Sequence, residues 1–225
     1  MQILVTAGST QIPIDQVRCI SNIFRGKTGA AIARYFIQRD GAVTLLTSSA
    51  DADDLLKLRQ GLTNKEKDNF HILKYRTFDD LARLMEIEIR TDKYDVIIHS
   101  AAVSDYQISR VFTDNLGTVE QNQKISSSHS KLYLELVPTI KLIDQIRRPW
   151  GFTGKLIKFK LQVGISDVEL LAIAKKSRRD SEADLIVANC LEWSQDRAYI
   201  VNDKDQVESV ERHNLPQTLA KALGL

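Results

Sequence analysis

Short apolar runs alternate with helix-like segments along this chain, and that alternation limits its fold more than any other feature. The runs are rich in β-branched residues and predict strands at 3–6, 43–47, 71–75, 95–100, 132–136, 156–161 and 184–188. Most of them are continuously apolar, as in parallel strands covered on both faces. The pattern therefore predicts an α/β fold: a doubly wound, mostly parallel, Rossmann-like sheet with helices on both faces.

The segments between the runs predict helices at 26–37, from 77 onwards, at 138–146, at 168–176 and from 216 onwards. The first of these ends at Asp40-Gly41, where Gly41 suits a left-handed C-terminal cap. Residues 199–201 and 207–210 predict a small antiparallel hairpin near the C-terminus. Residues 103–128 show little periodicity and many Ser, Asn and Gln, so a long loop is expected there.

Size and composition favour one cytoplasmic domain. The 225 residues show no internal repeat and no linker, so we expect a single domain over residues 1–225. A net charge of +2 lacks the basic excess typical of nucleic-acid binding, and no apolar run approaches the roughly 18 residues of a membrane span. Cys19 and Cys190 are too few and too far apart for a disulfide scaffold, and both are expected to be buried. No nucleic-acid or membrane partner is expected.

The first turn, Thr6 to Thr10, follows the first predicted strand. Ligands of open α/β sheets bind beyond the carboxyl ends of the strands. Gly8 would let a ligand approach the backbone closely, while Ser9 and Thr10 offer hydroxyl groups. The sequence has neither a GxGxxG pattern nor a complete phosphate-binding P-loop. An ordinary turn between a strand and a loop is the alternative.

Arg18 and Asn22 lie four residues apart, which would place them on one face if this segment were helical. The predicted helix at Gly26 to Gly29 begins just beyond them, and free N–H groups at a helix N-terminus suit an anion. Together these residues predict an anion-binding corner. The alternative is a solvated Arg18 beside an Asn22 that only caps a turn.

Several separated motifs occur in one order across nearly the whole chain. They are Val5–Thr10, Pro13–Asp15, Val17-Arg18, Ile20–Asn22, Gly26–Gly29, Ser100–Tyr106, Lys124-Ile125, Leu134–Pro138, Phe159–Leu161 and Asp184–Asn189. This ordered set resembles the phosphopantothenate–cysteine ligase family, although no single motif identifies it. In many bacteria the ligase is fused behind a flavin-dependent decarboxylase. Because this chain starts at the ligase's first strand, the resemblance implies a stand-alone form without a flavin.

The resemblance implies a reaction in coenzyme A biosynthesis. The family joins 4′-phosphopantothenate to L-cysteine. A nucleoside triphosphate first activates the pantothenate carboxylate as an acyl-nucleotide and releases pyrophosphate, and the cysteine amine then displaces the nucleoside monophosphate. Several negative charges meet in the first step, so fixed cations and N–H donors are needed, and Mg²⁺ is expected on the nucleotide phosphates. A homodimer, with the substrate pocket completed across its interface, is also implied.

Site residues follow from positions within the motifs. The resemblance implies substrate binding by Arg18, Asn22, Ala101 and Ala102. It implies nucleotide binding by Gly8, Ser9, Thr10, Asp105, Lys124 and Phe159. Lys124, in a mobile loop, and Asn22 are the implied catalytic residues: Lys124 would turn over the acyl-nucleotide and Asn22 would contact the acyl intermediate. No protein ligand is expected for the metal.

The chain departs from bacterial members in its nucleotide pocket. Gly8-Ser9-Thr10 replaces Gly-Gly-Thr, and Phe159–Gln162 is closer to eukaryotic members. Two lysines of many bacterial forms fall on Ser177 and Ser181. Lys176 or Arg178 could replace them only with a shifted helix register, and the basic cluster at 175–179 is expected to be a solvated helix face. CTP, the nucleotide typical of bacterial members, is favoured, and these departures leave ATP open.

Two other functions fit parts of the pattern. A Rossmann-type oxidoreductase of the short-chain dehydrogenase kind would need Tyr-x-x-x-Lys, and none of the six tyrosines has a lysine four residues on. A non-catalytic nucleotide-binding domain of the same fold would bind nucleotide tightly without releasing pyrophosphate. Lys124 would then be dispensable.

Overall fold

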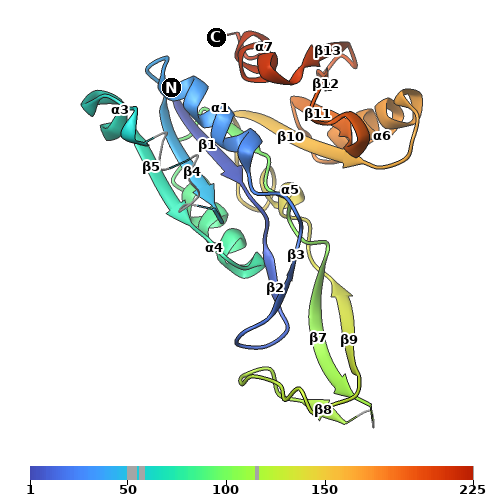
Figure 1. Ribbon diagram of the computed structural model, residues 1–225. Coiled ribbons are helices and arrows are strands. Elements are labelled where there is room, and N and C mark those ends of the chain that lie inside the picture. Colours follow the sequence, from blue (N-terminus) through green and yellow to red (C-terminus); the bar gives the residue numbers. More distant parts are fainter. Residues whose placement is uncertain (50–54, 56–58, 115–116, 225) are drawn as a thin grey trace.

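The computed structural model describes residues 1–49, 55, 59–114 and 117–224. An eight-stranded sheet forms the body of the molecule, in the order β13-β12-β11-β10-β6-β1-β4-β5 (Figure 1). Its six parallel strands are β1 (Gln2–Ala7), β4 (Ala42–Thr47), β5 (Phe70–Lys74), β6 (Val96–His99), β10 (Lys155–Gln162) and β11 (Leu185–Cys190). Counted along the chain, these six lie in the order 3-2-1-4-5-6 of doubly wound dinucleotide-binding folds. The predicted mostly parallel sheet is confirmed.

The C-terminal strands run against the others. β12 (Arg197–Val201) pairs antiparallel with β11, and β13 (Val207–Glu211) pairs antiparallel with β12. This confirms the hairpin predicted near the C-terminus. Two single-turn 3-10 helices, η1 (Leu191–Trp193) and η2 (Arg212–Asn214), flank the pair.

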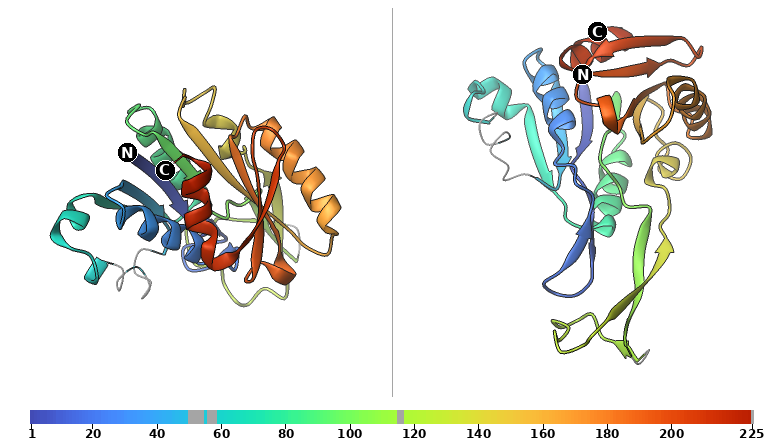
Figure 2. Two further views of the ribbon diagram at one scale, coloured as in Figure 1. Left: turned by 90° about the horizontal axis from the view of Figure 1, so that it is seen from above. Right: turned by 45° about the vertical axis from the view of Figure 1, so that its right-hand side comes forward.

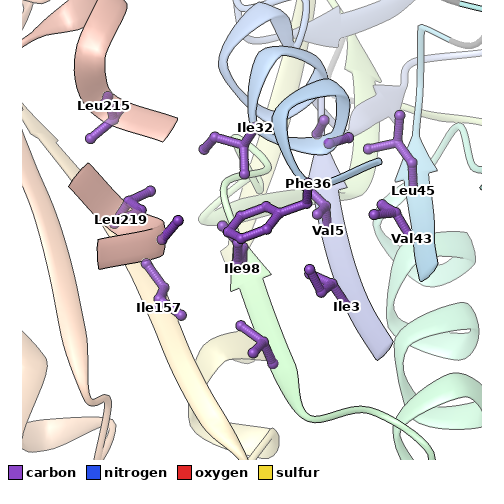
Figure 3. Packing of buried hydrophobic residues seen from close by; sticks show 14 of the residues in the cluster. Ile3, Val5, Ile32, Phe36, Val43, Leu45, Ile98, Ile157, Leu215 and Leu219 are labelled. Carbon is purple, nitrogen blue, oxygen red and sulfur yellow. The ribbon is translucent and has the colours of Figure 1, made fainter. Parts of the chain in front are cut away.

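Alternating side chains of the parallel strands pack against helices on opposite faces of the sheet. Ile3, Ile98 and Ile157 point toward α1 (Lys27–Ile37) and α7 (Leu215–Ala222), as Figure 3 shows. Leu4, Ile97 and Leu156, each one residue away, pack with α4 (Phe78–Ile89) and α5 (Leu142–Gln145) on the other face. The third helix of that face, α6 (Asp167–Asp180), packs on β11, and a short α3 (Asn64–Asp68) precedes β5. Helices on both faces are thus confirmed (Figure 2).

Helix α1 ends differently from the expectation. The residue with left-handed backbone is Asp40, with φ of 59°, and not Gly41. Gly41 is required for another reason: a Cβ there would lie 2.8 Å from the carbonyl oxygen of Phe36. The Gly41 N–H donates to that same carbonyl at 3.0 Å, so close approach rather than positive φ selects glycine.

A second, smaller layer extends away from the sheet (Figures 1 and 2). It combines the hairpin of β2 (Gln11–Pro13) and β3 (Cys19–Ser21) with the antiparallel strands β7 (Tyr106–Thr113), β8 (Thr118–Val119) and β9 (Leu132–Pro138). We call these two parts, residues 11–21 and 106–138, the arm. β2 contacts β7 within it.

The arm corrects two expectations. The stretch 103–128 is not a continuous loop, because it contains β7 and β8; residues 115 and 116 lie outside the described residues. In β7 only Val111 is buried, so this strand lacks the alternation by which strands are recognised. The helix expected from Pro138 also begins later, because Pro138 ends β9 and α5 spans only Leu142–Gln145.

None of the helices in the described ranges is long and apolar enough to cross a membrane.

Candidate functional site

The carboxyl ends of β1 and β6 lie side by side where the strand order reverses, and this is where doubly wound folds bind ligands. The backbone joins the two strands beyond the sheet. The Ala102 N–H donates to the Gly8 carbonyl at 2.8 Å, and the Thr10 N–H donates to the Ala102 carbonyl at 3.3 Å. The structure therefore brings together the predicted residues of the first turn and of the segment after β6.

The N-terminus of helix α1 packs directly on the first turn. Gly8 and Gly26 have φ of +89° and +78°, and a Cβ on Gly26 would fall 2.5 Å from the Gly8 nitrogen. A Cβ on Gly29 would fall 2.6 Å from the Cβ of Ala7. No side chain caps the helix at Gly26. The first N–H groups of α1 thus lie beside the glycine turn and suit an anion.

Asn22 contacts the segment after β6 that is also bonded to the first turn. Its Nδ2 donates to the Ala102 carbonyl at 3.2 Å, and the hydroxyls of Ser21 and Ser9 meet at 3.0 Å. The segment that carries Asn22 is the β2–β3 hairpin and not a helix, so the expected shared helical face with Arg18 is wrong. Strand β3 separates the two residues, and Arg18 lies in the hairpin's turn.

Arg18 and Lys124 form a second group, on the arm. The Asp15 carboxylate accepts hydrogen bonds from Arg18 at 2.5 Å and from the Ile125 N–H at 3.0 Å. Arg18 donates in turn to the Ile125 carbonyl at 3.0 Å. The hydrogen bonds from Arg18 hold the pKa of Asp15 far below its usual range. Lys124 is exposed, directly before the buried Ile125.

Asp105 follows a residue that contacts the first turn, whereas Phe159 lies within strand β10. Asp105 is exposed and follows Ser104, whose N–H donates to the Thr10 hydroxyl at 2.9 Å. Phe159 is half-buried in β10, and it packs with the core on the α1 side of the sheet. It directly follows Lys158, which pairs with His99, the last residue of β6. Phe159 thus lies within β10, one residue past the level at which β6 ends.

A buried polar group lies just below the first turn, and sequence reasoning did not find it. The Thr6 hydroxyl accepts from the Ala101 N–H at 3.1 Å and meets Nδ1 of His99 at 2.9 Å. Burial lowers the pKa of His99 to about 4, with the nearby Lys158 contributing. Burial also lowers the pKa of Lys158 to about 8. Polar residues at Thr6, His99 and Lys158 within apolar strands were the available signal.

Lys158 also occupies the place of the missing lysines. Its Nζ donates to the Ser177 carbonyl and to the Ser181 hydroxyl, both at 3.0 Å. Lys176 instead pairs with Asp180 at 2.7 Å. The ammonium group at these two serines therefore comes from β10 and not from α6.

Arg178 corrects the expectation of a wholly solvated basic face on α6. Arg178 is only 7% exposed, and its guanidinium donates to the carbonyl of Ala183 and to the carboxylate of Asp205. Arg178 thus ties α6 to the turn between β12 and β13. Its guanidinium serves the packing of the helix, and within the described ranges it makes no hydrogen bond to Ser177 or Ser181.

Arg212 is a second residue that the motifs did not indicate. Its Nη2 donates to the hydroxyl of Thr28, in the first turn of α1, and its buried Nη1 has no hydrogen-bond partner among the residues that the structure describes. In the described part of the chain no carboxylate forms an ion pair with Arg212, and burial lowers its pKa. A cation is thus held at the positive end of a helix dipole without a counter-charge, an arrangement that an anion would stabilise.

Cysteine and metal chemistry are limited within the described ranges. Cys190 is buried as expected, but Cys19 is exposed on the hairpin, which corrects the expectation for it. No group of three His, Cys, Asp or Glu side chains suited to a metal ion occurs among the residues that the structure describes.

Comparison with known proteins gives a consistent family. Residues 1–222 match the family described as the DNA/pantothenate metabolism flavoprotein C-terminal domain. The coenzyme A biosynthesis bifunctional protein CoaBC of Thermococcus kodakarensis is 30% identical over 94% of this chain and 47% of its own length. The CoaBC protein of Borreliella burgdorferi is 24% identical over 99% of this chain and 52% of its own. The chain thus spans about half the length of these relatives.

Solved structures agree. The crystal structure of the DNA/pantothenate metabolism flavoprotein from Streptococcus pneumoniae has a TM-score of 0.82 and 31% identity, over 100% of this chain and 98% of that one. A Cab2 mutant in complex with phosphopantothenate-cysteine has a TM-score of 0.76 over 98% of this chain and 86% of that one. At 18% identity, the second likeness concerns the fold alone.

Proposed function

Because the chain belongs to the family of DNA/pantothenate metabolism flavoprotein C-terminal domains, we propose that it is a phosphopantothenate–cysteine ligase. It would join 4′-phosphopantothenate to L-cysteine through an acyl-nucleotide. The observation that carries the proposal is the contact of three separate motifs at the strand ends: the Gly8 turn, Asn22 and Ala102. Residues 1–222 match the family as one stretch, which supports a single domain.

The first step needs positive charge where a carboxylate attacks a phosphoryl group. The nucleotide phosphates would lie over Gly8, Ser9 and Thr10, against the N–H groups in the first turn of α1 and the guanidinium of Arg212, whose Nη1 lacks a partner within the described ranges. Asp105 and Phe159 would contact the nucleoside. Mg²⁺ would bind chiefly to phosphate oxygens and water, as is usual for this ion. CTP remains the favoured nucleotide and ATP the alternative.

The second step needs the activated carboxyl group to be held while the cysteine amine attacks it. Asn22, Ala101 and Ala102 would bind the acyl group at the strand ends, and Arg18 would bind the phosphopantothenate. Lys124 would stabilise the nucleoside monophosphate as it leaves. Arg18 and Lys124 both lie on the arm, apart from the Gly8 turn in the fold.

We also propose a homodimer that uses the arm. Large apolar side chains are exposed on the arm and the segments next to it: Val17, Ile20, Ile23, Phe24, Tyr106, Tyr133, Leu136 and Ile140. Exposed apolar patches commonly mark interfaces between proteins. A second copy covering them would bring its own arm to the strand ends.

Pyrophosphate release tests the function. Purified protein would be mixed with 4′-phosphopantothenate, cysteine and Mg²⁺, with CTP or ATP in separate reactions. Release that depends on phosphopantothenate would support the ligase, and the ratio of the two rates would define the nucleotide. Tight nucleotide binding without release, from folded protein, would favour a non-catalytic nucleotide-binding domain.

A further inference from the structure

Asp15 lies in the turn of the β2–β3 hairpin, and its carboxylate is fully engaged. The side chain is 0% exposed. One oxygen accepts from the N–H groups of Val17 and Arg18, at 2.8 and 2.7 Å. The other accepts from the Arg18 guanidinium and from the Ile125 N–H. Asp15 therefore organises its own turn and reaches across 110 residues of sequence to a second segment.

The second segment is held by both of its backbone polar groups. The Ile125 N–H donates to Asp15, and the Ile125 carbonyl accepts from Nη2 of Arg18 at 3.0 Å. The Ile125 side chain is buried as well, at 2% exposed. We call this arrangement of Asp15, Arg18 and Ile125 the clamp. Because an uncompensated buried carboxylate is costly, the clamp is stable only while its donors stay in place.

We infer that Asp15 is a positioning residue that acts through the clamp on Lys124. The inference rests on the proposed function, in which Lys124 assists departure of the nucleoside monophosphate. Lys124 precedes Ile125, so the hydrogen bond of the Ile125 N–H fixes the peptide group that follows the Lys124 Cα and narrows the region that the Lys124 side chain can search. A lysine held in this way needs little further ordering to meet the acyl-nucleotide.

The clamp also links Lys124 to the substrate residue Arg18. Arg18 uses Nε and Nη2 to hold Asp15 and Ile125, while no hydrogen bond within the described residues occupies its Nη1. Its side chain is 40% exposed. The free edge of the guanidinium can therefore bind an anionic group of the substrate while the other edge holds the Lys124 segment. Occupancy of the substrate site would then strengthen the positioning of Lys124.

Trypsin gives a direct test, because it cleaves the Lys124–Ile125 bond that the clamp holds. Release of fragments 1–124 and 125–225 would be timed by mass spectrometry for the parent, Asp15→Asn and Ile125→Ala. Ile125→Ala loosens the segment by a substitution outside the hairpin sequence, and Asp180→Asn, which removes a carboxylate paired with Lys176, is the control. We expect faster cleavage in the first two variants and the parental rate in the control. Parental cleavage of a folded Asp15→Asn protein would overturn the inference.

Turnover separates positioning from simple structure. With phosphopantothenate saturating, so that weaker binding by a loosened Arg18 is overcome, Asp15→Asn should leave acyl-nucleotide formation within about twofold while slowing its conversion to product at least about tenfold. Adding Asp15→Asn to Lys124→Gln should cause little further loss, since the carboxylate acts through the lysine. If the double variant loses the product of the two single-variant rate factors, Asp15 does not act through Lys124. If the parent releases no pyrophosphate, the proposed function fails, whereas the trypsin result still decides whether the clamp holds the segment.

Discussion

Gly26 and Gly8 are in backbone contact although 17 residues separate them: a Cβ on Gly26 would fall 2.5 Å from the Gly8 nitrogen. In dinucleotide-binding folds one compact glycine-rich turn joins the first strand to its helix. Here the β2–β3 hairpin is inserted between them, and α1 still returns to the same place. The proposed anion site is therefore assembled from two glycine turns that are distant in sequence.

This contact predicts a large difference between two glycine substitutions. Gly151 has φ of +77°, almost equal to that of Gly26, but a Cβ on Gly151 would meet no atom within 4 Å. Gly151→Ala should therefore cost only the left-handed conformation, about 1–2 kcal/mol. Gly26→Ala should cost at least about 2 kcal/mol more, because backbone must move. Urea unfolding of both variants measures this, and equal losses would contradict it.

Arg212 provides a prediction for nucleotide binding. Arg212→Gln removes the unpaired cation beside α1 but retains a donor for Thr28. The KM for the nucleoside triphosphate should rise about tenfold or more, while the KM for cysteine changes little. Arg148→Gln, at a side chain that is 85% exposed, is the control. An unchanged nucleotide KM would exclude Arg212 from the phosphate site.

Much of the sheet was predictable because the strands of its body are buried on both faces. The run from Val43 to Thr47 combines apolar and β-branched residues, and its short length and the preceding Gly41 distinguish strand from helix. The C-terminal hairpin was predictable from its polar turn. Motif order placed Gly8, Asn22 and Ala102 in one site, and the structure brings these three into contact.

The arm was not predictable from periodicity. Strand β7 exposes half of its side chains, including Tyr106 at 50%, and buries only Val111, so polar and apolar residues follow no period of two. Its pairing is carried by backbone hydrogen bonds to β9, which leave no mark on the sequence. The roles of Asp15, Arg212 and Lys158 were missed for a related reason. Each acquires its role from a contact more than 15 residues away, and only the fold supplies that contact.

Lys124→Gln tests the second step directly. The substitution removes the charge but keeps a polar side chain that is one bond shorter. Pyrophosphate should form in a burst of about one equivalent per site, after which the acyl-nucleotide accumulates and product forms slowly. Quenched reactions with labelled phosphopantothenate would show the intermediate. Lys131→Gln, at another exposed lysine on the arm, should behave as the parent. Product formation at the parental rate would rule out the role of Lys124.

His99 makes the protein sensitive to mild acid. Its pKa is about 4 in the folded protein, because burial disfavours the charged ring, and about 6.5 when unfolded. As pH falls from about 6.5 to about 4, the unfolded chain takes up a proton that the folded protein does not, so the free energy of unfolding decreases. The full effect is on the order of 3 kcal/mol. His99→Asn keeps an acceptor near the Thr6 hydroxyl and cannot titrate. Denaturant unfolding across this pH range should therefore show a flatter slope for the variant, even with lower stability at pH 7. Equal slopes would mean that the imidazole is protonated within the fold or reached by water.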